Sequence, residues 1–113
     1  MDCIFCKILN GEILSKKVYE NEFVYAFNDI NPLAPVHVIV IPKKHIESAN
    51  EIAETNSKYI AKVFEAIPNI AKELGIADEG YRVITNVGEN GGQTVKHIHF
   101  HILGGTKLND KLV

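Results

Sequence analysis

Residues 97–103 read His-Ile-His-Phe-His-Ile-Leu, so three histidines alternate strictly with large apolar residues. Because successive side chains of a β-strand point to opposite faces, a strand here places His97, His99 and His101 on one face. The apolar residues between them face the other way, which is the period-two pattern of a half-buried strand. Three imidazoles in one row concentrate nucleophilic, proton-transfer and metal-ligand chemistry. The alternative is a solvated polar face, but such faces are usually filled by lysine, glutamate and threonine.

The segments outside this stretch alternate between strand patterns and one long helical pattern. Runs of β-branched and aromatic residues predict strands at 97–103 and at 18–20, 23–27, 36–41 and 81–87. The run at 36–41 is apolar almost throughout, which is typical of a central strand buried on both faces. A short helix is expected at 3–10, ended by Gly11.

The long helix is predicted from apolar residues that recur at helical spacing between Thr55 and Gly75. Thr55 is expected to cap its N-terminus, and Gly75 can supply the left-handed position after its C-terminus. Pro68 lies inside the helix and is expected to kink or divide it. Antiparallel strands, one intervening helix and short connections together predict an α+β fold.

Length and charge narrow the class of protein. A chain of 113 residues suits one domain, 1–113, that buries its own core. The net charge is −2 and no basic block exceeds two lysines, which argues against a nucleic-acid or membrane-surface partner. No apolar run approaches the roughly 20 residues of a membrane span, and the N-terminus has no pattern of a secretion signal. These features predict a cytoplasmic protein.

Cys3 and Cys6, the only cysteines, have the spacing of a metal clip. Zinc prefers four ligands, so two histidines would have to complete the site. His45 lies outside the histidine row, and His97 is the first residue of that row, so both are candidates. An uncoordinated pair of reduced cysteines, with His45 an ordinary surface residue, stays open. A redox dithiol is disfavoured because no thioredoxin-like βαβ pattern surrounds the pair.

The middle position of the row makes His99 the expected nucleophile, since a neighbouring histidine can donate a hydrogen bond to an oxyanion or leaving group. The turn Gly91-Gly92-Gln93-Thr94 comes directly before the row. Its glycines allow backbone N–H groups to approach an anion closely, which suits a phosphate. Taken alone, Gly-Gly is also a common hairpin turn.

The whole pattern from Cys3 to Gly105 resembles the histidine-triad (HIT) superfamily, in particular its Hint branch of nucleoside phosphoramidases. The likeness includes the motifs Phe-Asn-Asp-Ile-Asn-Pro at 27–32, Val-His at 36–37, Val-Ile-Pro-Lys-Lys-His at 40–45, Asn-Val-Gly at 86–88 and Gly-Gly-Gln-Thr at 91–94. It implies a HIT-like α+β fold with a five-stranded antiparallel sheet, one long helix and a short N-terminal helix. It also implies a homodimer.

The resemblance further implies a reaction on a purine nucleotide. His99 would attack the α-phosphorus of a nucleoside phosphoramidate and form a nucleotidyl-histidine that water hydrolyses to the nucleoside monophosphate. His101 would hydrogen-bond the phosphate or leaving group, and His37 matches the family's fourth histidine. The implied nucleotide contacts are Asn86, Gln93 and Thr94 for phosphate and leaving group, Asp29 for the ribose, and Phe5, Ile8, Phe27 and Ile30 for the base. For Phe5 and Ile30 taken alone, core packing is the simpler explanation.

Members of the branch that carry the cysteine pair look like zinc proteins, and the matching ligands here are Cys3, Cys6, His45 and His97. Four protein ligands close the coordination shell, so the metal would be structural. Two features differ from the family's pattern: Thr94 stands where serine is common, and residues 106–113 lack an aromatic- and proline-containing tail that shapes leaving-group preference. A dinucleoside polyphosphate hydrolase, or a zinc-stabilised nucleotide-binding or scaffold protein with incidental turnover, are the alternative functions.

Overall fold

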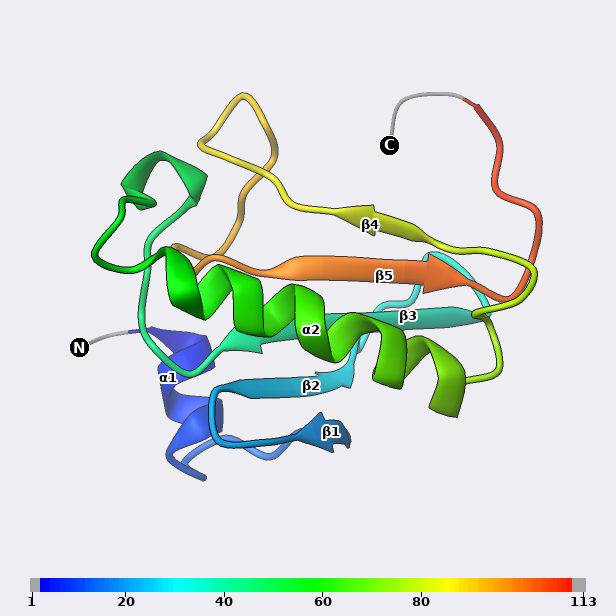
Figure 1. Cartoon of the computed structure of the whole chain (residues 1–113), viewed down its shortest axis with the longest axis horizontal. Helices are drawn as coiled ribbons and strands as arrows, with labels where there is room; N and C mark the ends of the chain where they lie inside the picture. The colour runs from blue at the N-terminus through cyan, green and yellow to red at the C-terminus, as the bar shows by residue number, and fades with distance from the viewer. Residues whose placement is uncertain (1–2, 111–113) are drawn as a thin grey trace.

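The strands expected from the sequence form one antiparallel sheet to which two helices are attached (Figure 1). The computed structural model describes residues 3–110. Its strands lie in the order β1-β2-β3-β5-β4, and all neighbours are antiparallel. In chain order the elements are α1 (Ile4–Leu9), β1 (Lys17–Glu20), β2 (Val24–Asn28), β3 (Val36–Pro42), the 3-10 helix η1 (Ala49–Glu51), α2 (Ser57–Glu73), β4 (Arg82–Ile84) and β5 (Phe100–Gly104). The predicted α+β fold, with one long and one short helix, is confirmed.

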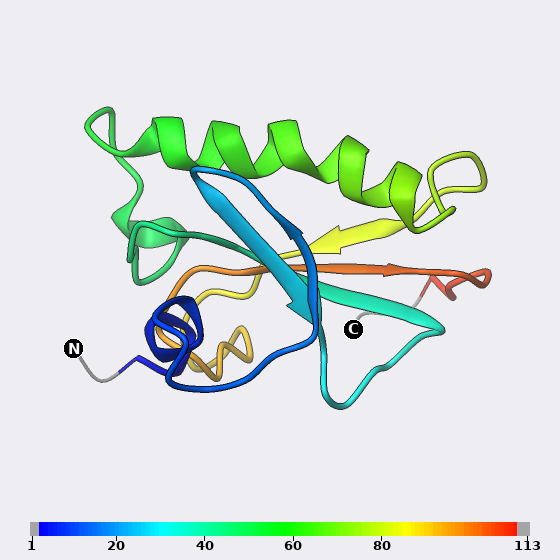
Figure 2. The ribbon, with the colours of Figure 1, turned by 90° about the horizontal axis from the view of Figure 1, so that it is seen from below.

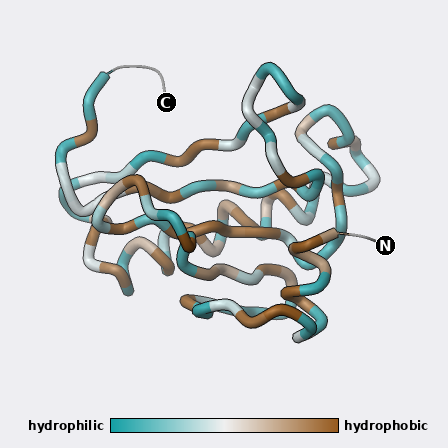
Figure 3. Tube along the Cα trace, turned by 180° about the vertical axis from the view of Figure 1, so that it is seen from behind, coloured by the Kyte–Doolittle hydropathy of each residue, from teal (hydrophilic) through white to brown (hydrophobic). Residues whose placement is uncertain are grey.

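The sheet is covered differently on its two faces. Helix α2 lies along one face and α1 lies on the other, as Figure 2 shows. Under α2, apolar residues of the strands pack with one side of the helix; they include Val38, Val40, Phe100, Ile102, Val63, Ile67 and Ile70. A smaller apolar cluster on the face of α1 contains Phe5, Phe27, Ile39 and Ile41. Strand β3 is therefore buried on both sides, as predicted, and the hydrophobic residues gather along the strands (Figure 3).

Helix α2 starts at another residue than predicted, and of the two outcomes expected at Pro68, a kink or a division, the division does not occur. It begins at Ser57 after Asn56, so Thr55 is not its N-cap, and the Asn56 amide instead accepts the N–H of Ala53 and donates to the carbonyl of Glu51. Pro68 does not divide the helix, which is continuous over 17 residues. Proline leaves the carbonyl four residues earlier without its helical donor. Both Pro68 and that residue, Phe64, are exposed, so water can satisfy the carbonyl.

The C-terminus of α2 follows the prediction. Gly75 adopts a φ of 73°, and the N–H of Ile76 reaches back to the carbonyl of Ala71 over 3.0 Å. This is the 6→1 hydrogen bond of a glycine-ended helix, and it brings Ile76 into the core. Among residues 3–110, neither helix combines the length and the apolar character needed to cross a lipid bilayer.

The histidine row is only partly regular strand. Strand β5 begins at Phe100 rather than at 97, and β4 covers 82–84 rather than 81–87. Upstream of β5, the N–H of Ile98 donates to the carbonyl of Ile46, so this part of the chain pairs with the segment after β3. The alternation nevertheless holds, because Ile98 lies in the core under α2 while His97 and His99 face away from it. Both histidines are buried, so a merely solvated polar face is excluded.

Candidate active site and metal centre

The imidazole of His99 is held in one orientation by the backbone of its own segment. Its Nδ1 lies 2.7 Å from the carbonyl oxygen of His97. Because a carbonyl only accepts, Nδ1 carries the proton, and the lone pair of the neutral ring is on Nε2. The Phe5 ring packs on this imidazole in a T-shaped arrangement, with the ring centroids 5.0 Å apart. His99 therefore has the tautomer and the fixed ring that a nucleophilic imidazole needs.

Two more imidazoles form a hydrogen-bonded pair beside His99. The backbone N–H of Leu33 donates to Nδ1 of His37 over 3.1 Å, so the proton of neutral His37 is on Nε2. This Nε2 lies 2.9 Å from Nδ1 of His101 and donates to it. The proton of neutral His101 is consequently on its own Nε2. The site thus presents a free lone pair on His99 next to an N–H donor on His101, with the two rings 5.1 Å apart.

Burial keeps these imidazoles uncharged at neutral pH. It lowers the pKa of His99 below the usual 6.5, and it lowers the pKa of His101 to about 4 together with the neighbouring His99 and His37. Burial also lowers the pKa of His37, although the carboxylate of Asp29 acts in the opposite direction. The neutral ring is the nucleophilic form of imidazole, and it is the form that burial favours for His99.

Asp29 closes the site from the loop between β2 and β3. Its Oδ1 accepts the backbone N–H of Asn31 over 2.8 Å, which is an Asx turn that orders the loop. Its Oδ2 lies 3.3 Å from Nε2 of His37, whose proton also reaches His101. One carboxylate therefore shapes the loop and contacts the histidine pair.

A cleft of about 800 Å³ opens next to Asp29, between α1 and the strands β2 and β3. All five residues expected to contact ribose and base line it: Asp29, Phe5, Ile8, Phe27 and Ile30. Phe5 is also a core residue, with its ring centroid 5.6 Å from that of Phe27. Ile30 is 91% exposed at the rim, so core packing does not explain it.

A second cleft, of about 320 Å³, lies against β4 and β5. His99 and His101 are part of its wall, and so are Asn86 and Thr94, two of the three residues expected to contact phosphate or leaving group. His37 lines both clefts. The histidines therefore lie where a large, mainly apolar cleft meets a smaller one.

Gln93, the third of those residues, lines neither cleft. Its Oε1 accepts the N–H of Gly88, and its Nε2 donates to the carbonyls of Glu47 and Val95. The backbone N–H groups of Gly92 and Gln93 likewise close the turn on the carbonyls of Glu89 and Gly88. This part of the turn holds its own shape and thereby places Thr94 at the cleft.

Four metal-ligating atoms from the residues singled out for zinc converge at the start of α1. Cys3 Sγ lies 3.4 Å from His97 Nδ1, Cys6 Sγ lies 3.4 Å from His45 Nδ1, and the two Nδ1 atoms are 3.2 Å apart. Metal–sulfur bonds of about 2.3 Å and metal–nitrogen bonds of about 2.0–2.1 Å in a tetrahedron separate sulfur from nitrogen by about 3.5 Å and two nitrogens by about 3.3 Å. The observed spacing matches, so the cluster could hold a metal ion.

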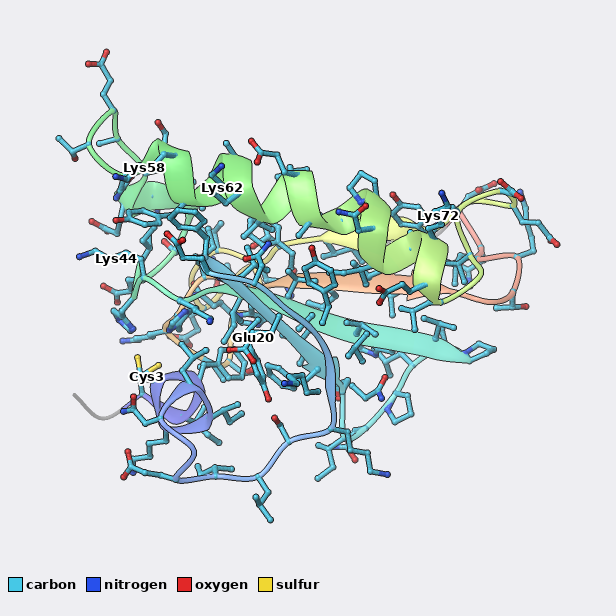
Figure 4. All side chains as sticks on the ribbon, turned by 60° about the horizontal axis from the view of Figure 1, so that its bottom comes forward. Cys3, Glu20, Lys44, Lys58, Lys62 and Lys72 are labelled. Atoms are coloured by element: carbon cyan, nitrogen blue, oxygen red, sulfur yellow. The ribbon has the colours of Figure 1, made fainter. Side chains whose placement is uncertain are left out.

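The surroundings prepare these atoms for a cation. His97 donates its Nε2–H to the carbonyl of Pro42 over 2.9 Å, which leaves the lone pair on Nδ1, and burial lowers its pKa to about 4. Burial and the adjacent Cys3 raise the pKa of the Cys6 thiol to about 11, so a bound cation has to displace that proton. Figure 4 shows Cys3 beside α1, at the same end of the molecule as Lys44, the neighbour of His45.

The comparison with known protein families agrees with this geometry. The model of the HIT domain matches residues 10–108. The chain belongs to the HIT domain family. It is 40% identical to the purine nucleoside phosphoramidase of Escherichia coli K12 across 98% of this chain and 93% of that protein.

Solved HIT structures superimpose over almost the entire chain. A HIT family hydrolase from Clostridium thermocellum is 48% identical with a TM-score of 0.95, and a histidine triad protein from Clostridium difficile is 53% identical with a TM-score of 0.94. Each comparison covers 99% of this chain and 97% of the other. The resemblance to the HIT family is thereby confirmed, and the expected cysteine pair is Cys3 and Cys6 of this chain.

Several groups that order this HIT site act through the backbone, and sequence reasoning missed them. The amide of Leu33 and the carbonyl of Pro42 fix the protons of His37 and His97, and any residue type could supply those groups. Thr85 donates its hydroxyl to the carbonyl of His99 over 2.7 Å, directly beyond the end of β4. In the sequence it was one hydroxyl in a predicted strand, with Val83 and Ile84 before it and Asn86 after it.

Proposed function

We propose that this HIT protein hydrolyses purine nucleoside phosphoramidates to nucleoside monophosphates through a covalent histidine intermediate. The observation that carries the proposal is the hydrogen bond from His99 Nδ1 to the His97 carbonyl, which directs a free Nε2 lone pair into a site of neutral imidazoles. The name of the Escherichia coli relative supports the same reaction class. The two clefts on either side of the histidines supply room for a nucleoside and a leaving group.

In the first step, Nε2 of His99 attacks the α-phosphorus as the phosphorus–nitrogen bond breaks. The leaving nitrogen takes the electron pair of that bond and needs one proton. Solvent supplies that proton as the bond breaks, while the Nε2–H of neutral His101 hydrogen-bonds a phosphoryl oxygen or the leaving nitrogen.

In the second step, water attacks the phosphorus and the bond to His99 Nε2 breaks. The nucleoside monophosphate leaves, His99 is again neutral, and the proton from the water returns to solvent. The hydrogen bond from His37 to Nδ1 of His101 keeps the ring oriented through both steps. Overall, one water is consumed and one amine is released, so atoms and charge balance.

We propose zinc as the ion of the cluster formed by Cys3, Cys6, His45 and His97. The donor set of two thiolates and two neutral imidazoles suits zinc, and a closed shell of four protein ligands makes the metal structural. Bound zinc would cross-link three parts of the chain: the start of α1, the segment after β3 and the segment before β5. His97 contributes its side chain to this cluster and its carbonyl to His99, so the cluster braces the nucleophile.

The decisive experiment for the function is product analysis on adenosine phosphoramidates with amine leaving groups. We expect stoichiometric release of adenosine monophosphate and amine. Faster cleavage of diadenosine polyphosphates would identify the protein as a polyphosphate hydrolase with the same His99 chemistry. Tight nucleotide binding with negligible turnover on both substrates would identify it as a nucleotide-binding or scaffold protein.

Ribose recognition by Asp29 gives a prediction about affinity. Replacing Asp29 with alanine should weaken binding of adenosine monophosphate by about 1–3 kcal/mol, because a charged hydrogen-bond acceptor is lost. Binding of the 2′-deoxy nucleotide should weaken less, since it has one hydroxyl fewer to lose. Isothermal titration calorimetry with both ligands measures the difference.

Asp29→Asn provides the matched control for the loop. Its amide oxygen can still accept the Asn31 N–H, so the Asx turn is kept while the charge is removed. If the carboxylate binds the diol, the asparagine variant should behave like the alanine variant. In both, affinity for the ribonucleotide should fall more than affinity for the 2′-deoxy nucleotide. Equal losses for ribose and deoxyribose in both variants would count against ribose recognition.

We propose in addition that residues 1–113 form a single HIT domain and that the protein acts as a homodimer in the cytoplasm. Support for association comes from β4, which forms one edge of the sheet, and from Phe64, which is 51% exposed on α2. An unpaired sheet edge and an exposed aromatic ring are features that an interface covers.

A further inference from the structure

The smaller cleft has a charge that the proposed chemistry does not use. Among the residues that line it, Arg82 is the one that carries a permanent charge, and the others are apolar, uncharged polar or histidine residues. Within residues 3–110 no carboxylate lines this cleft, whereas Asp29 lines the larger one. A permanent positive charge, with no carboxylate beside it among these residues, therefore marks the smaller cleft.

The register of the sheet places Arg82 on the side of the reaction centre. Arg82 pairs with Leu103, and Ile84 pairs with His101. Residues that pair across antiparallel strands share a face, as do residues two apart in one strand. Arg82 is thus on the face of His101 and about 7 Å further along the strand.

The guanidinium retains binding capacity in this position. Its Nη2 donates to the backbone carbonyl of Asn109 over 2.7 Å, which ties the group to the segment after β5. A guanidinium has five N–H donors, so most remain available. Among the described residues no carboxylate forms an ion pair with Arg82.

The order of the strands indicates on which side of the histidines each part of a bound substrate lies. The larger cleft is over β2 and β3, the histidines of β5 follow, and β4 with Arg82 is beyond them. A nucleoside in the larger cleft with its phosphorus at His99 leaves the remaining substituent on the side of β4. This substituent is the leaving group of the proposed reaction.

We infer that Arg82 selects leaving groups that carry an anion, a carboxylate or a phosphate, so that the preferred substrates are nucleoside phosphoramidates of acidic amines. The inference rests on the proposed function. Arg82 is a specificity-determining residue here: its N–H donors bind the carboxylate or phosphate of the amine, while the phosphorus–nitrogen bond breaks at His99 as described above. Planar guanidinium groups suit both anions, because two parallel N–H donors match two oxygens.

The test compares adenosine phosphoramidates whose leaving amines differ only in charge. β-Alanine carries a carboxylate, β-alaninamide is its neutral counterpart, and O-phosphoethanolamine carries a phosphate. We expect kcat/KM to be about tenfold higher for the carboxylate than for the amide, as for a charged hydrogen bond at a partly exposed site. The phosphate arm shows which anion is preferred. The preference should shrink at high ionic strength, because salt screens an exposed charge.

Variants of Arg82 identify the source of the preference. Arg82→Gln should lower the ratio of carboxylate to amide about tenfold, and Arg82→Lys should restore part of it. Lys107→Gln is the matched control, because Lys107 is an exposed cation in the neighbouring segment that lines neither cleft. This control should keep the wild-type ratio. A wild-type ratio near one, or an equal loss on both substrates in Arg82→Gln, would overturn the inference.

A binding arm separates this inference from the proposed function. Non-hydrolysable adenosine sulfamates that end in a carboxylate or in its amide can be titrated into wild type and Arg82→Gln by calorimetry. The wild type should bind the carboxylate ligand more tightly than the amide ligand, and Arg82→Gln should bind the two equally. This result supports the role of Arg82 even if the protein turns over no phosphoramidate. Equal affinities in the wild type contradict it, whatever the outcome for turnover.

Discussion

Replacing His99 with alanine is expected to lower turnover of adenosine phosphoramidates by at least about 10⁴-fold, because the nucleophile is gone and no other nitrogen takes its place. A nucleotidyl-enzyme trapped by rapid acid quench should disappear with it. Nucleotide affinity should change little, since the larger cleft does not include His99. Single-turnover kinetics and calorimetry on the same preparation measure both quantities.

The alanine variant also leaves the carbonyl of His97 without its donor, which costs about 1–3 kcal/mol of stability. His99→Asn is the better matched variant, because the asparagine amide can donate from nearly the position of Nδ1 but offers no nucleophilic nitrogen. It should keep the thermal midpoint of the wild type and show the same loss of turnover. His101→Ala should lose less, about 10²–10⁴-fold, as expected for a hydrogen-bond or proton donor. Near-normal turnover in His99→Asn would rule out covalent catalysis by this residue.

Removing a ligand of the metal cluster is expected to have the largest effect on stability. Elemental analysis of the wild type should find about one zinc per chain. Cys3→Ser and His45→Ala should each lose the metal and lower the melting temperature by roughly 10 °C or more, equivalent to a few kcal/mol in a domain of this size. Activity should fall only as a consequence, because the metal is not expected to touch the substrate.

Lys44→Gln is the control for this pair of variants, since Lys44 is exposed and precedes His45 directly. It should bind zinc and melt like the wild type. Chelation of the wild type should reduce stability and nucleotide affinity together. Loss of turnover before any loss of stability would indicate a catalytic metal instead. Protein that contains no zinc and melts unchanged with a strong chelator would leave Cys3 and Cys6 as an uncoordinated thiol pair.

The sequence was sufficient to predict which side chains of each strand face the core. Buried residues recur at a fixed spacing in strands and helices, and this spacing is visible in the sequence. The alternation at 97–103 predicted which side chains face α2, and the apolar run at 36–41 predicted a strand buried on both sides. Gly75 predicted the end of α2, since glycine is favoured in the left-handed conformation that this end requires.

The boundaries of the elements could not be predicted in the same way. The start of α2 at Ser57 has no capping signal, because the side chain of Asn56 at the N-cap position bonds Ala53 and Glu51 instead of the helix. The start of β5 depended on Ile98 pairing with Ile46, a contact between residues 52 positions apart. At the site, the residue types were visible but their protonation was not, because Pro42 and Leu33 act through atoms that every residue possesses. Arg82 was likewise only one charge in a strand until the register placed it beside Leu103.

The hydrogen bond from the Leu33 amide to His37 has a consequence for how this site can be studied. The side chain of Leu33 is largely exposed, and replacing it tests only its contribution to the wall of the smaller cleft. Yet its N–H determines which nitrogen of His37 holds a proton, and through His37 which nitrogen of His101 does so. Genetic replacement by any residue except proline keeps that N–H. Only chemical editing of the main chain, such as an ester in place of the amide, would remove the hydrogen bond while retaining the leucine side chain.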